Sequence, residues 1–400
     1  MKSFDPTAFR HQFPALHQAG CYLDSAATAL KPLTLVQATG EYYAHNGATV
    51  HRSAHSAAQN ATDRFESARE SVRELINAAS HQQIVWTKGT TEAINLVAQS
   101  YARPRLKAGD EILVSESEHH SNLIPWLMVA QQTGATVIKL PLDQRYLPDL
   151  TQLEQLLTGK TKILAIGHMS NVTGGCPDLK LAIELAHKNG TIVVVDGAQG
   201  VVHSPPDVQQ LDVDFYAFSA HKLYGPTGIG VLYGKSTLLA EMAPWQGGGK
   251  MLTQASFDGF EAQSVPECFE AGTPNIAGVI GFGATLSWLN TQDIVQAEHY
   301  ACSLAQLAYE KLATIPGFIS YRAQNSSLLA FNIAGFHHSD IATLLSEQGV
   351  AIRSGQHCAQ PLLDAIGVSG TLRASFAPYN QPDDVDKLYQ SLIRALSLLE

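Results

Sequence analysis

The sequence has few of the features that mark secreted, membrane-spanning or metal-binding proteins. Its 400 residues include five cysteines, an odd number, scattered without any Cys-x-x-Cys pair, which argues against a zinc ribbon or a disulfide framework. No apolar run reaches the length of a membrane span, and residues 1–5 lack the apolar core of a signal peptide. We therefore expect the protein to work in a reducing cytoplasm.

Positive charge is also scarce. The chain carries 26 Lys and Arg against 36 Asp and Glu, a formal net charge of -10, which argues against nucleic acid or an anionic membrane as the main partner. Hydrophobic residues make up 45% and charged residues 16%, a composition that builds a large core and excludes extensive disorder. The length predicts two or more structural units, and the sequence has no internal repeat.

The order of predicted elements indicates an α/β fold. Strands alternate with helices from about residue 84 to 233, a pattern typical of a mostly parallel sheet. One of these strands, 191–196, is apolar throughout, which predicts burial on both faces. The predicted strands in this part are 84–87, 111–115, 137–140, 163–166, 191–196, 215–218 and 229–233.

A second, smaller unit is predicted beyond about residue 300. The pattern there changes to that of an α+β unit, and its final helix carries an apolar face from Val385 to Leu399. Glycine-rich stretches at 245–249 and 257–274 predict irregular chain at the joint between the two units. We therefore predict a large domain over 16–285 and a small domain made of 1–15 and 286–400, which carries a cysteine loop.

Lys222 lies on a tight connection between two predicted apolar strands. The glycines and proline of 225–230 make a turn there that no helix would tolerate. Ser219 and His221 stand beside the lysine and can both bind an anion. A Schiff-base cofactor needs such a place, because the amine binds its aldehyde and the donors bind its phosphate. The alternative, which this stretch alone favours, is an exposed lysine next to a hairpin.

Two further turns carry residues suited to the same kind of ligand. The turn 88–92 joins a strand to a helix and presents Thr90 and Thr91, whose hydroxyls suit an anion, although a threonine before glutamate is also an ordinary helix cap. Asp196 ends an apolar strand at the edge where open α/β sheets bind ligands, although it could equally cap the next helix.

The adjacent histidines 119 and 120 predict a cofactor contact and no metal site. On a helix they point in different directions, so they are poor joint ligands for a metal ion. The segments together fit one cofactor instead: Lys222 binds it covalently, Asp196 keeps a pyridine nitrogen protonated, and His119 stacks on the ring. The predicted phosphate donors are Thr90, Thr91, Ser219 and His221.

This combination resembles the fold-type I pyridoxal-phosphate enzymes of the class V aminotransferase group. More narrowly, the chain is similar from end to end to the second-group cysteine desulfurases, and among them to the cysteine sulfinate desulfinase (CsdA-type) enzymes. The resemblance implies pyridoxal 5'-phosphate as cofactor, with a mostly parallel sheet in the large domain and a smaller α+β domain. The motifs that carry it are Leu-Asp-Ser-Ala-Ala (23–27), Val-His-Arg (50–52), Gly-Thr-Thr-Glu (89–92), Glu-His-His-Ser-Asn (118–122), Ser-Asn-Val-Thr-Gly (170–174), Asp-Gly-Ala-Gln (196–199), His-Lys-Leu-Tyr-Gly-Pro-Thr-Gly-Ile-Gly (221–230), Phe-Glu-Ala-Gly-Thr-Pro-Asn (269–275) and Arg-Ser-Gly-Gln-His-Cys (353–358).

The resemblance also assigns residues to the cofactor. Gln199 is expected to hydrogen-bond the ring hydroxyl, and Asn171 to contact the ring or the substrate. Thr273 is expected to reach the phosphate of the neighbouring subunit's cofactor, which implies a homodimer with shared active sites.

Other residues are assigned to the substrate in the same way. Arg373 is expected to clamp the substrate carboxylate, because a guanidinium group can bind it through two parallel hydrogen bonds. Arg353 and Asn171 are expected to assist it, and His51 is expected near the entrance of the site.

Cys358 separates a desulfurase from related enzymes. Most cysteines are structural, and we interpret the other four in this way. Cys358 follows His357 and lies near Arg353 in the sequence, an electropositive setting that favours a thiolate nucleophile. The implied reaction turns L-cysteine, its sulfinate or selenocysteine into L-alanine: Lys222 takes the α-proton, Cys358 accepts sulfur as a persulfide, and His119 serves the proton transfers of the thiol. The resemblance also implies a sulfur-acceptor protein of the SufE/CsdE kind.

Two alternatives stay open on the sequence. Another pyridoxal-phosphate enzyme, such as an aminotransferase or a kynureninase-like hydrolase, would share Lys222 and Asp196 but give Cys358 no role. A sulfur carrier or scaffold on the same fold would turn over no substrate, and the intact set of four site residues argues against it. These four are Lys222, Asp196, His119 and Arg373.

Overall fold

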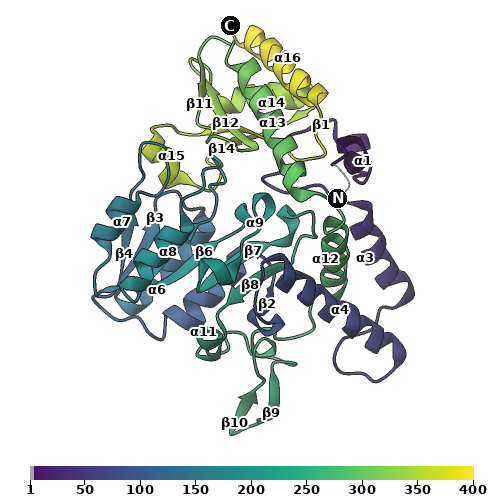
Figure 1. Ribbon diagram of the computed structural model, residues 1–400, viewed down its shortest axis with the longest axis vertical. Coiled ribbons are helices and arrows are strands. Elements are labelled where there is room, and N and C mark those ends of the chain that lie inside the picture. Colours follow the sequence, from purple (N-terminus) through teal and green to yellow (C-terminus); the bar gives the residue numbers. More distant parts are fainter. Residues whose placement is uncertain (1–3) are drawn as a thin grey trace.

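The computed structural model describes residues 4–400, which form a large part around one sheet and a small part around another (Figure 1). Residues 1–3 lie outside the described residues. They are part of the predicted small domain and of the segment 1–5, which we expect not to be a signal peptide. The predicted domain boundaries stay a prediction.

The large part is organised around a seven-stranded sheet of order β2-β8-β7-β6-β5-β3-β4. The strands of β7, β6, β5, β3 and β4 run parallel, and β8 runs antiparallel to both of its neighbours. The predicted α/β fold with a mostly parallel sheet is confirmed. The strands are β2 (Ile84–Thr87), β3 (Glu111–Ser115), β4 (Thr136–Leu140), β5 (Thr161–Gly167), β6 (Ile192–Asp196), β7 (Phe215–Ser219) and β8 (Gly230–Gly234).

Helices cover both faces of this sheet. Successive strand residues alternate between two hydrophobic clusters, so that Val193 and Val195 belong to one cluster and Val194 to the other. All three valines are fully buried, as the apolar strand predicted. The first cluster packs against α4 (Ser56–Leu75), α8 (Leu179–Lys188) and α12 (Ile276–Leu289), and the second against α5 (Thr90–Leu96) and α6 (Ile124–Thr133).

The small part has a four-stranded antiparallel sheet of order β11-β12-β15-β14. Its final helix, α16 (Pro382–Leu399), buries Val385, Leu388 and Leu392, as its apolar face predicted. The N-terminal strand β1 (Cys21–Tyr22) pairs in parallel with β13 (Val350–Ala351). The other elements are β11 (Phe318–Ser320), β12 (Leu328–Ile333), β14 (Arg353–Gly355), β15 (Thr371–Ser375), α13 (Ile294–Leu312), α14 (His338–Glu347) and α15 (Gln360–Ile366).

The prediction of irregular chain over 245–249 and 257–274 is wrong for 259–262, which form β10 (Gly259–Ala262). This strand pairs with β9 (Leu252–Ser256) in a hairpin that projects from the end of the molecule opposite to α16 (Figure 1). Nearly all of its residues are exposed, so the alternation of buried and exposed side chains that reveals a strand in the sequence is missing.

Shorter helices connect these elements. Near the N-terminus lie α1 (Pro6–Arg10) and α2 (Leu16–Ala19), separated by Pro14, which lacks the N–H that a helix interior needs. The remaining helices are α3 (Leu33–His45), α7 (Leu150–Leu156), α9 (Gly200–His203), α10 (Val208–Leu211) and α11 (Ser236–Ala240). Within residues 4–400, no helix combines the length and the apolar character that crossing a bilayer requires.

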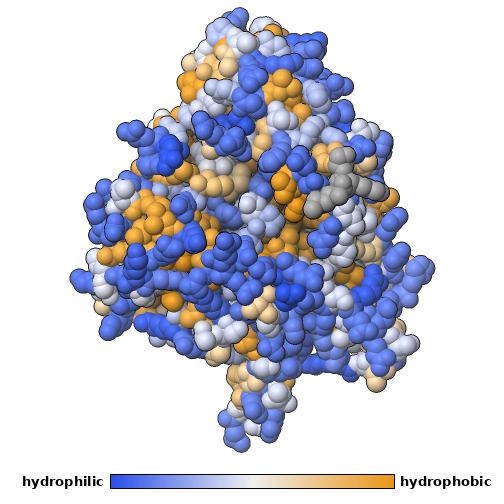
Figure 2. All heavy atoms as spheres, viewed as in Figure 1, coloured by the Kyte–Doolittle hydropathy of each residue, from blue (hydrophilic) through white to orange (hydrophobic). Residues whose placement is uncertain are grey.

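The surface is polar over most of the face seen in Figure 2, with apolar areas interspersed. One such area lies over the region of α8 (Figure 2). Leu181 of α8 is among the exposed apolar residues. Scattered apolar side chains of this kind are normal on a folded protein.

Candidate active site

A cavity of about 220 Å³ lies where the carboxyl ends of the large sheet's strands face the small part. Open α/β sheets bind their ligands at this edge. Most of the predicted site residues line it: Lys222, Cys358, His119, Asp196, Gln199, Thr90, Thr91, Ser219, His221, Asn171, Arg373 and Arg353. Two do not, Thr273 and His51.

Lys222 ends a short 3₁₀ turn, Ala220–Lys222, between β7 and β8. The Gly225 N–H closes the turn by donating to the Ala220 carbonyl at 2.8 Å, and a Cβ at Gly225 would lie 2.6 Å from the Phe282 ring. Burial lowers the pKa of Lys222 to about 8, with the Asp196 charge opposing this and Arg373 adding to it. At pH 7 about a tenth of the amine is then neutral and nucleophilic, far more than for a lysine of ordinary pKa.

Asp196 ends β6 and is buried in the wall of the cavity. Its Oδ1 accepts a hydrogen bond from the Ala198 N–H at 2.9 Å, and its Oδ2 has no hydrogen-bond partner among residues 4–400. Burial raises the pKa of Asp196, whereas the hydrogen bond from Ala198 and the positive charge of Lys222 lower it. A cation against the open oxygen is what would keep this carboxylate ionised.

Hydroxyl groups gather at the other end of the cavity. The Thr90 N–H donates to Ser219 Oγ at 2.8 Å, and the two hydroxyls lie 2.7 Å apart. The backbones of Gly89 and Gly230 approach so closely that a Cβ on Gly230 would lie 2.3 Å from the Gly89 Cα. Glycine is therefore required where the strand meets this turn, and the hydroxyls are available to an anion.

His119 is held in one tautomer. Its Nδ1 accepts a hydrogen bond from the Ser121 N–H at 3.0 Å, so the neutral ring carries its proton on Nε2. Burial, followed by the charge of Lys222, lowers its pKa to about 4. The ring is neutral at physiological pH, which suits it to stacking on a flat ligand.

Glu118 is a site residue that the sequence analysis did not assign. It lines the cavity and is buried, its Oε1 accepts from the Gly167 N–H at 2.7 Å, and its Oε2 accepts from the Asn122 side chain at 2.7 Å. The only signal in the sequence is its place beside the two histidines of 119 and 120.

Two arginines face each other at the mouth of the small part. Arg353 of β14 and Arg373 of β15 are direct partners in an antiparallel pair, an arrangement that is unfavourable unless an anion lies between them. Arg373 is almost fully buried, and it donates to the Asn171 carbonyl at 2.7 Å and to Asp24 at 3.3 Å. Its Nε is buried without a hydrogen-bond partner.

The loop between β14 and α15 carries Cys358, which is exposed to the cavity. His357 and Cys358 have φ angles of 52° and 55°, a left-handed conformation that costs free energy for both residues. The Cys358 carbonyl accepts from the His120 N–H at 2.7 Å, and the His357 carbonyl accepts from the Asn171 side chain at 2.8 Å. These bonds hold the thiol in place.

The predicted contribution of His357 to an electropositive setting is wrong. His357 is buried, and burial, followed by the charge of Arg373, lowers its pKa to about 3, so the ring is uncharged at neutral pH. The positive charge that surrounds the cavity comes from the arginines and from Lys222.

The contacts of three predicted residues do not test their expected roles. Gln199, which lines the cavity, donates its side-chain N–H to the Ala26 carbonyl at 2.8 Å. His51 binds Glu66 on α4, and Thr273 lines a second cavity of about 520 Å³. Their roles in cofactor and substrate binding stay predictions.

The residues of the cavity fit pyridoxal 5'-phosphate. A nucleophilic amine, a carboxylate oxygen without a partner and a group of hydroxyls stand around one space, as an aldehyde, a pyridinium N–H and a phosphate require. Together with the mostly parallel sheet, these groups define a pyridoxal-phosphate enzyme of fold type I.

The chain belongs to the aminotransferase class-V family, whose profile matches residues 21–388. It is 64% identical over 399 residues to the cysteine desulfurase CsdA of Escherichia coli (strain K12), with 100% of both chains covered. It is 49% identical over 399 residues to a probable cysteine desulfurase of Vibrio cholerae, with 98% of each covered. A crystal structure of the Escherichia coli cysteine desulfurase CsdA (S-sulfonic acid) matches with a TM-score of 0.96 and 63% identity, over 99% of this chain and 100% of that chain.

Proposed function

We propose that the protein is a pyridoxal-phosphate-dependent cysteine desulfurase that releases L-alanine from L-cysteine and carries the sulfur on Cys358 as a persulfide. One observation carries the proposal: the Cys358 thiol and the Lys222 amine line the same cavity. The cysteine desulfurase names of relatives at 64% and 49% identity support the same activity.

Arg353 and Arg373 bind the substrate in this proposal. We infer that the carboxylate of an amino acid lies between the guanidinium groups of Arg353 and Arg373, which otherwise repel each other. Lys222 lines the same cavity, so the proposed binding mode has the substrate's α-carbon within its reach.

Lys222 serves as the base. Bound pyridoxal phosphate withdraws electrons from the α-carbon of an attached amino acid and makes its proton labile. Burial has lowered the pKa of the Lys222 amine to about 8, which lets it take that proton near neutral pH.

Cys358 accepts the sulfur. Its thiolate attacks the sulfur of the substrate, so that an S–S bond forms and the substrate's C–S bond breaks. The electron pair of the broken bond stays with the carbon fragment, which takes a proton and leaves as L-alanine. L-cysteine and the thiolate thus yield L-alanine and a persulfide anion with no other reactant. His119, neutral and with its Nδ1 occupied, offers Nε2 for the thiol's proton transfers.

Several finer points belong to the proposal. Cysteine sulfinate and selenocysteine are further substrates, and an accessory acceptor protein of the SufE/CsdE kind removes the sulfur for uses such as iron–sulfur cluster assembly. The enzyme works in the cytoplasm as a homodimer in which Thr273 contributes to the neighbouring site. The large domain over 16–285 binds the cofactor, and the small domain of 1–15 and 286–400 carries the cysteine loop.

The proposal is tested by measuring L-alanine from each of the three substrates, with and without a reductant. We expect Cys358→Ala to abolish turnover of L-cysteine while keeping the yellow colour of the bound cofactor, and Lys222→Ala to lose both. With the sulfinate, whose sulfur leaves as sulfite, we expect Cys358→Ala to retain turnover. Cysteine turnover that survives Cys358→Ala would overturn the persulfide step, and amino-group transfer to a keto acid would favour an aminotransferase.

A further inference from the structure

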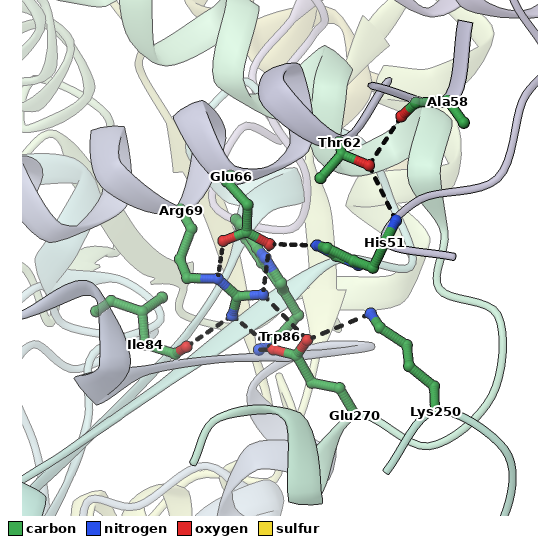
Figure 3. Close-up of polar contacts among 9 residues, drawn as sticks. All are labelled: His51, Ala58, Thr62, Glu66, Arg69, Ile84, Trp86, Lys250 and Glu270. Carbon is green, nitrogen blue, oxygen red and sulfur yellow. Dashed lines mark hydrogen bonds and ion pairs between the residues drawn. The ribbon is translucent and has the colours of Figure 1, made fainter. Parts of the chain in front are cut away.

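Two motifs singled out in the sequence lie outside the catalytic cavity, and a buried ionic network joins them. Figure 3 shows this network, in which Arg69 of α4 lies between Glu66 and Glu270. On one side Glu66 binds His51 of the 50–52 motif, and on the other Glu270 belongs to the 269–275 motif that contains Thr273. The two motifs are separated by more than 200 residues and are connected through two side chains of α4, Glu66 and Arg69.

The Glu270 carboxylate is held at a fixed position. It accepts two hydrogen bonds from Arg69, at 2.6 and 3.1 Å, and a third from the Trp86 N–H at 2.9 Å (Figure 3). Arg69 also donates to the Ile84 carbonyl at 2.8 Å, so the pair is anchored to β2. Both side chains are nearly inaccessible to solvent, with 1% and 3% of their surfaces exposed.

A third segment, the glycine-rich strap 247–250, joins the network. The Gly249 carbonyl accepts from the Gly272 N–H at 2.7 Å, next to Thr273. The Lys250 ammonium lies 3.9 Å from Glu270 and 5.3 Å from the centre of the Phe65 ring, and it is buried without a hydrogen-bond partner. The strap and the turn at 270–273 are therefore one packed unit.

Backbone strain marks the same unit. His51 and Lys250 have φ angles of 67° and 75°, in the left-handed region that side chains larger than glycine rarely adopt. The His51 N–H donates to Thr62 of α4 at 2.9 Å, which holds the strained turn in place. Strain of this kind persists where the surrounding structure fixes a residue for a purpose.

Stability alone does not account for the network. Removing charges from water costs several kcal/mol per ion, and buried ion pairs of this kind are often no more stabilising than apolar residues of similar volume. What a buried ionic network does provide is a single permitted arrangement of the segments that it connects. Those segments here are the turns of His51 and Thr273.

The position of this unit points to a second copy of the chain. The turn 88–92 separates the two cavities: Thr90 and Thr91 line the catalytic one, and Lys88 and Glu92 line the one that contains Thr273. In a twofold dimer both subunits present the same surface patch to each other, so the residues that support the partner and the site that receives support belong to one patch of the chain. Two cavities that share the turn 88–92 can both belong to such a patch.

We propose that Glu270, Arg69 and Glu66 are positioning residues, which fix the turns of His51 and Thr273 as one rigid support for the catalytic cavity of the partner subunit. The inference rests on the proposed function, because it takes the homodimer with shared sites as its starting point. It adds that the network acts across the interface and not on the cavity of its own chain.

Mixed dimers test this directly, because the same substitutions can be distributed in two ways. The first dimer pairs a Lys222→Ala chain with a Glu270→Gln chain, and the second pairs a wild-type chain with a Lys222→Ala, Glu270→Gln chain. Each dimer has one Lys222 and one glutamine at 270. In the first, the intact cavity faces an intact network; in the second, it faces the altered one.

We expect the first dimer to keep the kcat/KM of a wild-type site with L-cysteine. We expect the kcat/KM of the second dimer to be lower by about tenfold to a hundredfold, because small displacements of positioning groups slow a reaction by such factors. Equal loss in both dimers, loss confined to the first, or no loss in either would overturn the positioning role. Absence of L-alanine from the wild-type dimer would instead overturn the proposed function.

A second variant covers the case in which Glu270→Gln does not fold. Glu66→Gln keeps the buried Arg69–Glu270 pair and weakens the bonds of residue 66 to His51 and to Arg69. We expect the same difference between the two mixed dimers with a smaller fold-change. Glu70→Gln, which removes an exposed pair with Arg73 on the same helix, is the matched control. It should leave kcat/KM unchanged in both distributions.

Discussion

At the scale of the residue, the chemistry depends on a lysine whose pKa burial lowers to about 8. Because only the neutral amine attacks an aldehyde, we expect the apo-protein to bind pyridoxal phosphate faster as the pH rises toward about 8, with little further gain above about 9. The measurement is the growth of the Schiff-base absorbance after mixing. Nα-acetyl-lysine, with an ordinary pKa, should keep accelerating over the same range, and a pH-independent rate for the protein would contradict the expectation.

Arg373 provides a second prediction at this scale. A lysine at 373 cannot reach both the Asn171 carbonyl and Asp24, and it offers no planar fork to a carboxylate. We expect Arg373→Lys to raise the KM for L-cysteine by more than about tenfold and to change kcat less. Arg105→Lys, at an exposed pair with Glu241, serves as the control. An unchanged KM in Arg373→Lys would remove this arginine from substrate binding.

The sequence predicts individual residues well where a turn fixes them. Lys222, Asp196 and Cys358 each follow a strand or a tight loop, and all three line one cavity as their motifs suggested. The ion pairs Asp24–Arg373 and Arg69–Glu270 could not be predicted, because each joins residues more than 200 positions apart. The charge state of His357 was also beyond the sequence, since it depends on burial by distant segments.

At the scale of the element, the turn from β3 to α6 holds His119 through the buried carboxyl of Glu118. Burial raises the pKa of Glu118 to about 8. The hydrogen bond from Asn122 lowers this pKa, whereas the negative charge of Asp196 raises it further. The folded state therefore keeps this proton up to about pH 8, and the unfolded state loses it near the ordinary value of 4.5. This contribution to stability is complete below pH 4.5 and is lost as the pH rises through about 8.

Comparison with Glu118→Gln checks this sign, because glutamine does not titrate. We expect the free energy of unfolding of the wild-type apo-protein, relative to that of the variant, to decrease between about pH 5 and about pH 8.5. Urea unfolding of both proteins at the two pH values gives the difference. A difference that stays constant, or increases with pH, would show that the buried carboxyl is ionised throughout.

The sequence predicts buried strands better than exposed ones. Strands β2 and β3 occupy the predicted ranges, because each is a short apolar run that ends at polar residues. The exposed β9–β10 hairpin gave no such signal. The pairing of β1 with β13 joins positions about 330 residues apart, and no local pattern encodes it.

At the scale of the whole molecule, the proposed homodimer predicts that cofactor retention depends on protein concentration. Thr273 lies outside the catalytic cavity of its own chain, so a dissociated subunit would lack this support for the phosphate. We expect dilution to lower the sedimenting mass from twice 43.1 kDa to 43.1 kDa and to release the cofactor over the same concentration range.

Thr273→Ala separates the two events. We expect this variant to sediment as the wild type does and to lose its cofactor at higher protein concentration, because it removes one phosphate donor and leaves the interface intact. A monomer that retains the cofactor fully would contradict both the shared site and the inference drawn from the ionic network.

The facing guanidinium groups of Arg353 and Arg373 also make the resting protein responsive to its chemical surroundings. Small organic acids carry the same planar carboxylate as an amino acid, and paired cations bind such anions. Organic acids would thus compete with the substrate for this place. Turnover of L-cysteine would then fall as organic acids build up and recover as they are consumed, without any dedicated inhibitor.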